Sequence, residues 1–530
     1  MQTSTEFPVR WEDPADAELT WRFDLAHTPD VMTPLGIDLY FRPFAAGMAN
    51  GMFYSKMCQQ NYYVYSSSPA PPADFDSAPI DPERVMRGVR RWRGEILPEV
   101  VGFIDHYRVT DFDAMAPAEL VHELAELVGV RRRCGELHFL AQRAYHFGMT
   151  HLIETYCELT GGSELSAVRL VQGHGNKSVE AGEALWRLAQ LATSVPSVRE
   201  RLLRVGGAPA KERIEELARD PESKAFVQAF SAYLDEFGWR SNLFELADPT
   251  WVEDPTIPLN QLRAYLEMSE YDPMEEQRKL AADREAELRK AVAGLAPEAQ
   301  TRLQTAVDVA KEAIPILEDH NYYIDQRAAM MPRRLVLAAG RWLVSEGLLA
   351  KADDVFYLHD HELRATLLGE TGDLLEVAQR RKDEMAFWSK VTPPDYLGAP
   401  PEAGPPGQKP DRFTGLRGLR SERRNELKGN AASAGLARGP ARVLLSLDDA
   451  DRLRPGDVLV ARTTMPPWTP LFAVASAVVT EIGGILIHAA VVAREYGLPA
   501  VLGVKDATRE IRDGQLLEVD GTNGIVRIIN

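Results

Sequence analysis

The feature that most constrains this chain is a stretch rich in proline and glycine at residues 393–410, PPDYLGAPPEAGPPGQKP, in which ten of eighteen positions are proline or glycine. Proline fixes φ and removes a backbone donor, whereas glycine adds conformational freedom. We therefore predict an extended, exposed connector over residues 393–413, with a domain on either side of it. A long surface loop inside a single domain is the alternative.

The pattern of apolar residues differs on the two sides of this stretch. In residues 1–392 apolar residues recur with the helical period, as at Leu120, Leu124, Leu127 and Val128. In residues 414–530 short β-rich runs alternate with Gly, Pro and Asp, and one helical stretch lies at 489–496. The runs are 441–447, 457–463, 476–482, 499–504, 516–520 and 524–529. We expect a large, mainly α-helical domain followed by a small α/β domain.

Charge and composition exclude several classes of protein. The chain has 60 Lys and Arg against 78 Asp and Glu, a net charge of −18, which argues against binding to nucleic acid or to an anionic membrane. It contains no apolar run of about 18 residues and no signal-peptide pattern, so we expect a cytoplasmic protein. Its three cysteines match neither a disulfide framework nor a zinc site.

The strongest local signal is TEIGGILIHAAVVAREYGLPAVLGV, residues 480–504. Gly483 and Gly484 follow a predicted strand and allow a phosphate or another backbone to approach closely, and His488 follows at the start of a helix. A phosphoryl group on the imidazole would be stabilised there by free backbone N–H groups and by Arg494. Such an imidazole suits nucleophilic catalysis, whereas a capping or core histidine is the alternative.

These residues resemble the phosphohistidine, or swivelling, domain of the phosphoenolpyruvate-utilising enzymes. The shared residues are Gly483, Gly484, His488, Ala489, Ala490, Ala493, Arg494, Gly497, Pro499 and Ala500. The resemblance covers about 100 residues, and it implies that His488 carries a phosphoryl group in a site that includes Gly483, Gly484 and Arg494. Ile487 stands where the family usually has Ser or Thr, so a hydroxyl that could bond the phosphoryl group or be a regulatory target is absent.

The first domain is similar, over residues 24–40, 236–255 and 320–358, to the acceptor-binding domain of rifampicin phosphotransferases and of phenol-phosphorylating synthases. In that family the swivelling domain moves between an ATP-grasp domain and an acceptor site. This chain shows no ATP-grasp pattern, and its segment 173–178 lacks the glycine that precedes lysine in a phosphate-binding loop. The resemblance therefore implies a separate ATP-grasp subunit that holds ATP and Mg²⁺, with no cofactor bound tightly by this chain.

Transfer of a phosphoryl group to a hydroxyl needs positive charge around the phosphoryl oxygens and a base at the hydroxyl. The cationic candidates are Arg240, Arg327, Arg333 and Arg334, with Asp325 in the same segment as the last three. His27 is the candidate that would orient or deprotonate the hydroxyl, and His174 is a weaker one. The alternatives are structural ion pairs for the arginines and a structural hydrogen bond for His27.

Two further clusters have simpler explanations. The aromatic residues at 53, 54, 62, 63 and 65 would line a flat apolar pocket or, as ordinary packing, fill a core. His359 and His361 lie two residues apart, which does not place two ligands on one helical face, so we predict no metal site in the chain.

The leading hypothesis is a dikinase-type phosphotransferase subunit. His488 would take a phosphoryl group from ATP, by way of the ATP-grasp partner, and pass it to the hydroxyl of a small organic acceptor, most simply a phenol. The alternatives are an antibiotic phosphotransferase of the rifamycin type divided between two chains, and a non-catalytic regulatory protein with a degenerate histidine domain.

Overall fold

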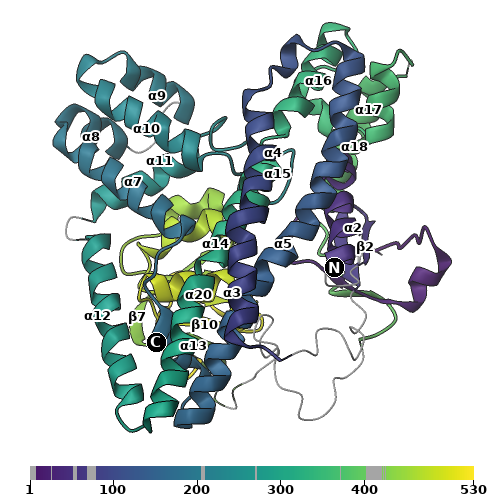
Figure 1. Ribbon diagram of the computed structural model, residues 1–530. Helices are drawn as coiled ribbons and strands as arrows, with labels where there is room; N and C mark the ends of the chain where they lie inside the picture. Colours follow the sequence, from purple (N-terminus) through teal and green to yellow (C-terminus); the bar gives the residue numbers. More distant parts are fainter. Residues whose placement is uncertain are drawn as a thin grey trace.

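The computed structural model describes residues 7–25, 27–51, 56–67, 79–204, 209–268, 271–370, 372–401, 421, 423 and 425–529. A large helical domain precedes a small α/β domain, as the sequence predicts (Figure 1). The helices of the first domain are α1 (Pro34–Gly36), α2 (Arg42–Gly51), α3 (Pro82–Arg91), α4 (Leu97–Val109), α5 (Pro117–Thr160), α6 (Glu164–Val168), α7 (Lys177–Ser194), α8 (Pro196–Leu203), α9 (Ala210–Ala218), α10 (Lys224–Phe237), α11 (Thr256–Glu267), α12 (Pro273–Val292), α13 (Pro297–Ala313), α14 (Pro315–His320), α15 (Ala328–Met330), α16 (Arg333–Ser345), α17 (Asp360–Leu367) and α18 (Leu374–Trp388). Three π-helical segments interrupt them, η2 (Ile37–Phe41), η3 (Trp92–Ile96) and η7 (Asn321–Arg327).

Helix α5 is the central element of the first domain. It begins at Pro117, where the carboxylate of Glu119 accepts a hydrogen bond from the backbone N–H of Ala116. It ends at Thr160 and is capped by Gly161, which has a φ of +66°. Its predicted stripe, which includes Leu120 and Leu124, is buried. Helices α2, α3, α13 and α14 pack against it, so α5 spans the domain from one end to the other (Figure 1).

The first domain also contains a small sheet that the helical pattern did not predict. Its strand order is β2-β3-β1-β4, formed by β2 (Lys56–Gln60), β3 (Tyr63–Ser67), β1 (Thr20–Phe23) and β4 (Tyr396–Gly398). The prediction of an exposed connector from residue 393 is therefore wrong at its start, because β4 pairs with β1 and Leu397 is buried. The rest of the predicted connector, residues 402–413, lies outside the described residues.

The C-terminal domain is built on an eight-stranded sheet of order β5-β12-β11-β7-β8-β9-β10-β6. The strands are β5 (Glu426–Lys428), β6 (Asn430–Ser433), β7 (Leu436–Leu444), β8 (Val458–Ala461), β9 (Ala477–Thr480), β10 (Ala500–Leu502), β11 (Leu516–Asp520) and β12 (Ile525–Ile529). Strands β7 to β10 run parallel to their neighbours in that order. The domain's helices are α19 (Thr469–Phe472), α20 (His488–Glu495) and α21 (Ala507–Glu510). Strands β8 and β9 are buried throughout because apolar clusters cover both faces of the sheet.

Several buried apolar clusters join the two domains. Trp251 and Ile257 of the helical domain belong to the same buried cluster as Leu447, Trp468 and Phe472 of the C-terminal domain. Figure 1 shows the C-terminal domain, in yellow, lying beside α12, α13 and α14 and below α7 to α11. Among the described helices we find none with the length and apolar character needed to cross a bilayer.

Candidate active site

His488 begins α20, directly after the loop that follows β9. Gly483 in this loop has a φ of +131°, and a Cβ there would lie 2.2 Å from Cδ1 of Ile487, so the turn requires glycine. The side-chain amide of Asn430 donates a 2.8 Å hydrogen bond to the Gly483 carbonyl. Ile487 occupies the N-cap position and offers no side-chain hydrogen bond to the helix. Backbone geometry, rather than a capping hydroxyl, therefore sets the position of His488.

The imidazole of His488 faces a carboxylate of the other domain. Its Nδ1 lies 2.8 Å from Oε2 and 2.9 Å from Oε1 of Glu318, on α14, and Ser178 donates a 2.6 Å hydrogen bond to the same carboxylate. Glu318 is fully buried. Because a carboxylate accepts the bond, the proton resides on Nδ1 and the lone pair resides on Nε2. Nε2 is buried and has no hydrogen-bond partner among the described residues. The contact therefore leaves Nε2 as the ring nitrogen with a free lone pair.

Arg494 lies at the other end of α20, and its side chain is buried. Its Nη1 donates hydrogen bonds of 2.8 Å and 2.9 Å to the carbonyls of Ala432 and Ile485. In this arrangement the guanidinium ties the loop before His488 to strand β6, so it positions the loop. A direct contact between Arg494 and a phosphoryl group stays a prediction.

A second interdomain contact lies at the C-terminal end of α20. The carboxylate of Glu495 accepts hydrogen bonds from the backbone N–H groups of Gly173 (2.9 Å) and Gly175 (3.3 Å), and Gln277 donates to the Glu495 carbonyl. Burial raises the pKa of Glu495 to about 7. The segment 173–178, which resembles a phosphate-binding loop only superficially, thus holds a carboxylate of the C-terminal domain. We call this contact the Glu495 latch.

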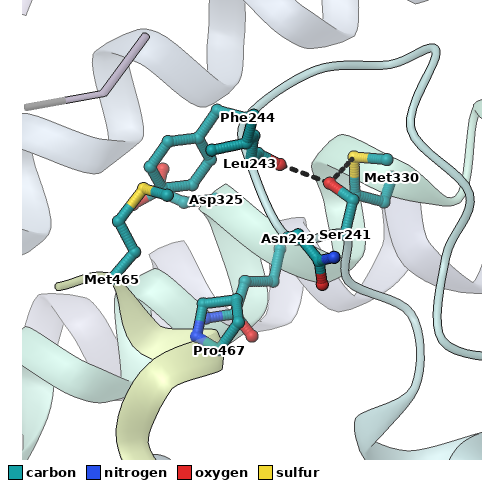
Figure 2. Close-up of a pocket in the computed structure, with 9 residues that line it drawn as sticks. Ser241, Asn242, Leu243, Phe244, Asp325, Met330, Met465 and Pro467 are labelled. Carbon is teal, nitrogen blue, oxygen red and sulfur yellow. Dashed lines mark hydrogen bonds between the residues drawn. The ribbon is translucent and has the colours of Figure 1, made fainter. Parts of the chain in front are cut away.

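A pocket of about 220 Å³ lies where the two domains meet. Figure 2 shows Asp325, Phe244 and Met330 of the helical domain on one side and Met465 and Pro467 of the C-terminal domain on the other. The other lining residues are Ser241, Asn242, Leu243 and Gln326. Ser241 donates a hydrogen bond to the Leu243 carbonyl, which shapes this wall (Figure 2). The pocket is mostly apolar and contains one carboxylate.

Asp325 connects this pocket to two buried histidines. Its Oδ1 lies 3.0 Å from Nδ1 of His138, on α5, and its Oδ2 lies 3.7 Å from Nε2 of His320, at the end of α14. Burial lowers the pKa of His320 to about 4, so this imidazole is neutral near pH 7. Burial alone would raise the pKa of Asp325, but His138 and His320 hold it below its usual value. An ionised carboxylate and a neutral imidazole therefore face each other beside the pocket.

Two family models match parts of this chain. Residues 453–524 match the mobile domain of PEP-utilising enzymes, and residues 138–318 match the fourth domain of rifampicin phosphotransferase. Residues 453–524 belong to the mobile-domain family of PEP-utilising enzymes. The resemblance predicted from the sequence is confirmed, and the mobile domain contains His488. The second match extends from His138 to Glu318, across the face of the helical domain on which the mobile domain docks.

Curated relatives show the same two similarities. Chondramide synthase cmdD of Chondromyces crocatus is 34% identical over 563 residues, covering 100% of this chain and 14% of the relative. The uncharacterized phosphotransferase YvkC of Bacillus subtilis is 31% identical, with 71% and 45% coverage. A rifampicin phosphotransferase of Streptomyces sviceus is 34% identical, with 67% and 40% coverage. The chain thus spans less than half the length of these relatives.

One solved structure, the solution NMR structure of Enzyme I (nEIt), aligns with 66% of this chain and 78% of its own at 13% identity. The TM-score is 0.16, which is too low to support an argument about the fold.

Of the predicted acceptor-site residues, His27 lies near the pocket. Its ring centroid is 6.2 Å from that of Phe244, and its Nδ1 lies 2.9 Å from Oδ1 of Asp24. The imidazole is 62% exposed. The charge of Asp24 raises the pKa of His27, which makes the imidazole a stronger base.

Arg240 and Arg327 lie together against Tyr322. Both guanidinium groups lie over the ring of Tyr322, at 5.9 Å and 5.5 Å, and Arg327 donates a hydrogen bond to the Tyr322 hydroxyl. Burial lowers the pKa of Arg240. Neither residue lines the pocket next to the mobile domain, although Arg327 follows Asp325 and Gln326 in η7.

Arg333 and Arg334 do not join this site. Arg333 donates to the carbonyls of Leu246 and Ala247 and pairs with Glu253, and Arg334 donates to the carbonyls of Tyr107 and Arg108. Both side chains line a different pocket on the outer face of α16. Their inclusion in a single acceptor site is wrong, because helix packing engages them with loops that are distant in the chain.

The remaining candidates also have structural partners. Tyr63 and Tyr65 belong to the core of the small sheet, and residues 53 and 54 lie outside the described residues. His359 Nδ1 bonds Asp38, whereas His174 lies in the loop of the Glu495 latch. Sequence reasoning missed Glu318, His138 and His320, although Glu318 and His320 precede Asp325 closely in LEDHNYYIDQR.

Proposed function

We propose that this chain is the carrier and acceptor portion of a phosphotransferase. Nε2 of His488 takes a phosphoryl group that originates in ATP and delivers it to the hydroxyl of a small organic acceptor. The observation that carries the proposal is the contact of His488 with Glu318, because it orients the carrier imidazole at the domain interface. The names of the relatives, two of which are phosphotransferases, support the same class of reaction.

Loading requires the mobile domain to leave this position. Nε2 of His488 is buried against the helical domain here, so a phosphoryl donor cannot reach it. We place the donor site in a separate ATP-grasp subunit that binds ATP and Mg²⁺. At that site Nε2 attacks the β-phosphorus of ATP, the bond from this phosphorus to the oxygen it shares with the α-phosphorus breaks, and AMP departs with the electron pair. Water then removes the γ-phosphoryl as inorganic phosphate, which leaves one phosphoryl group on Nε2.

We place delivery at the same interface, in an arrangement that opens around Nε2, because the phosphoryl group and the acceptor need room that the buried Nε2 does not have here. The acceptor hydroxyl loses its proton to a base, its oxygen attacks phosphorus, and the bond between phosphorus and Nε2 breaks, returning the electron pair to the imidazole. His27, paired with Asp24 near Phe244, is the base that the geometry supports. Nδ1 keeps its proton, held by Glu318, so the leaving imidazole is neutral.

The pocket favours a small acceptor. In this position its free space is only about 10 Å³, roughly that of a single water, so binding of an acceptor requires the walls to move apart. Phe244, Met330 and Met465 provide apolar walls suited to a flat ring, and a flat ring needs less opening of these walls than a rifamycin macrocycle. A phenolic acceptor is therefore our first choice, and a rifamycin-type acceptor is the second.

The test uses radiolabelled ATP. The chain is mixed with ATP labelled at the β-phosphoryl, Mg²⁺ and a candidate ATP-grasp protein, followed by phenol or a rifamycin. We expect an acid-labile label on the wild-type chain, transfer to phenol, and neither label nor product with His488→Ala. Turnover by His488→Ala would overturn the proposal. Absence of label with an active donor would favour a non-catalytic regulatory role.

A further inference from the structure

The cluster of His138, His320 and Asp325 brings together three elements of the helical domain. His138 comes from α5, His320 from the end of α14 and Asp325 from the π-helical segment η7. We propose that these three side chains bind a divalent first-row transition-metal ion. Binding of the ion is independent of the proposed function, whereas any role of the ion toward the acceptor rests on it.

The distances fit a coordination site. One nitrogen from each histidine and an oxygen of Asp325 all lie within 4.8 Å of one another. The separations are 3.0 Å from Asp325 Oδ1 to His138 Nδ1 and 3.7 Å from Asp325 Oδ2 to His320 Nε2. With metal–ligand bonds of about 2.0–2.2 Å, neighbouring ligand atoms lie roughly 3.0–3.5 Å apart. The third separation, between the two histidine nitrogens, is at most 4.8 Å, so binding of an ion would draw the two imidazoles closer together.

A hydrogen bond from the other ring nitrogen of His320 fixes the tautomer that a metal ligand requires. Its Nδ1 lies 2.8 Å from the Ile316 carbonyl, so Nδ1 carries the proton and Nε2 carries the lone pair. A hydrogen bond from the second ring nitrogen to a backbone carbonyl is how metal-binding histidines are usually oriented.

Without an ion, this arrangement is only partly satisfied. The lone pair of His320 Nε2 faces the carboxylate of Asp325, and two hydrogen-bond acceptors 3.7 Å apart repel each other. Gln142 donates to His320 Nε2 at 3.2 Å, and the buried Arg131 offsets part of the carboxylate's charge. A cation between the two acceptors would turn that repulsion into two bonds, while the Gln142 amide rotates away.

The ligand set indicates the class of metal. Two imidazoles and one carboxylate suit Zn²⁺, Mn²⁺, Fe²⁺ or Co²⁺, whereas Mg²⁺ prefers oxygen ligands alone. Asp325 also lines the pocket with Phe244 and Met330, so the open coordination positions lie toward the place of the acceptor (Figure 2). Such an ion would bind the acceptor oxygen and lower the pKa of its hydroxyl.

The experiment measures metal binding by the full chain without turnover. Chelator-treated protein is titrated with Zn²⁺ by calorimetry, and with Co²⁺ by visible absorption, which reports nitrogen and oxygen ligation. We expect one equivalent of each ion and no comparable binding of Mg²⁺. Asp325→Asn and His320→Ala should weaken Zn²⁺ binding at least tenfold. His361→Ala, which removes an exposed histidine outside the cluster, should leave it unchanged.

The variants also separate this site from adventitious binding. Asp325→Asn keeps the side-chain volume, so circular dichroism and thermal melting verify that its fold is retained. The proposal is overturned if the folded wild-type chain binds less than one equivalent of Zn²⁺, or if Asp325→Asn and His320→Ala bind it as tightly as His361→Ala. Because this readout requires no phosphoryl donor, it is independent of the labelling test for His488.

Discussion

Nδ1 of His488, in the mobile domain, lies within 2.9 Å of both carboxylate oxygens of Glu318, in the helical domain. The two residues are 170 positions apart in the chain. Each domain therefore carries half of the arrangement that orients the carrier imidazole. If the mobile domain moves as proposed, His488 keeps this partner only in the arrangement seen here.

Replacement of Glu318 should affect delivery and not loading. Glu318→Gln keeps the volume but removes the charge, and a charge-assisted hydrogen bond contributes about 1.5–3 kcal/mol. We expect phosphoryl transfer from preloaded enzyme to the acceptor to slow about 10–100-fold in single-turnover assays, with loading from ATP unchanged. Ser178→Ala, which removes only the 2.6 Å bond to Glu318, should cause a smaller loss. Equal slowing of loading and delivery would show that Glu318 supports only the fold.

The pH dependence of delivery should report on His27. As a base it must be unprotonated, and the charge of Asp24 raises its pKa above the ordinary 6.5. The rate of delivery should therefore fall as the pH drops, with an acid limb centred above pH 6.5. Asp24→Asn should move this limb to lower pH, and His27→Gln should remove it while slowing delivery about 10²–10⁴-fold. An unchanged profile in His27→Gln would assign the base elsewhere.

The Glu495 latch should weaken as the pH rises. Burial raises the pKa of this carboxyl to about 7 in the docked state, whereas an exposed glutamate has a pKa near 4.5. The docked state then binds the proton more tightly, so docking becomes less favourable between about pH 4.5 and pH 7 and changes little above pH 7. Amide hydrogen exchange at Gly173 and Gly175, corrected for intrinsic rates, should be faster at pH 8 than at pH 6. Glu495→Gln should show no such pH dependence, and a persisting one would require a different group.

The loop before His488 should not tolerate a side chain at position 483. Gly483→Ala combines an unfavourable φ with a contact of 2.2 Å to Ile487 Cδ1, at a cost of about 1–3 kcal/mol in unfolding free energy. Adding Ile487→Val removes that atom and should recover part of the loss, measured as a coupling free energy in chemical denaturation. Gly102→Ala, in α4 with open space around it, should be neutral or stabilising. Equal stability of the wild type and Gly483→Ala would contradict this account of the turn.

The overall division of the molecule follows from local patterns that the sequence displays directly. The helical period at Leu120 and Leu124 predicts α5, because side chains at that spacing share one helical face. The short runs after residue 414 predict strands β7 to β12 in the same way. The glycines around residue 483 and the position of His488 at a helix start are also local features, and the structure has both.

Other features could not be predicted from local patterns, because they depend on which distant segments pack together. Strand β4 follows Pro-rich residues and was predicted as connector, but its partner β1 begins at Thr20. Arg333 and Arg334 are residues of the type that binds phosphate. In the folded chain, however, the packing of α16 places them where they donate hydrogen bonds to backbone carbonyls.

The sequence by itself determined the domain types, the place of His488 at a helix start and the glycine turn before it, since each depends on residues within a few positions of one another. Only the tertiary structure decided that Glu318 faces His488, that Glu495 meets the loop at 173–175, and that His138 meets Asp325, 187 residues away. The spacing of residues along the chain does not predict such contacts. These contacts form because burial of apolar surface brings α5, α14 and the mobile domain together. The polar groups that become buried between them must then form hydrogen bonds with one another.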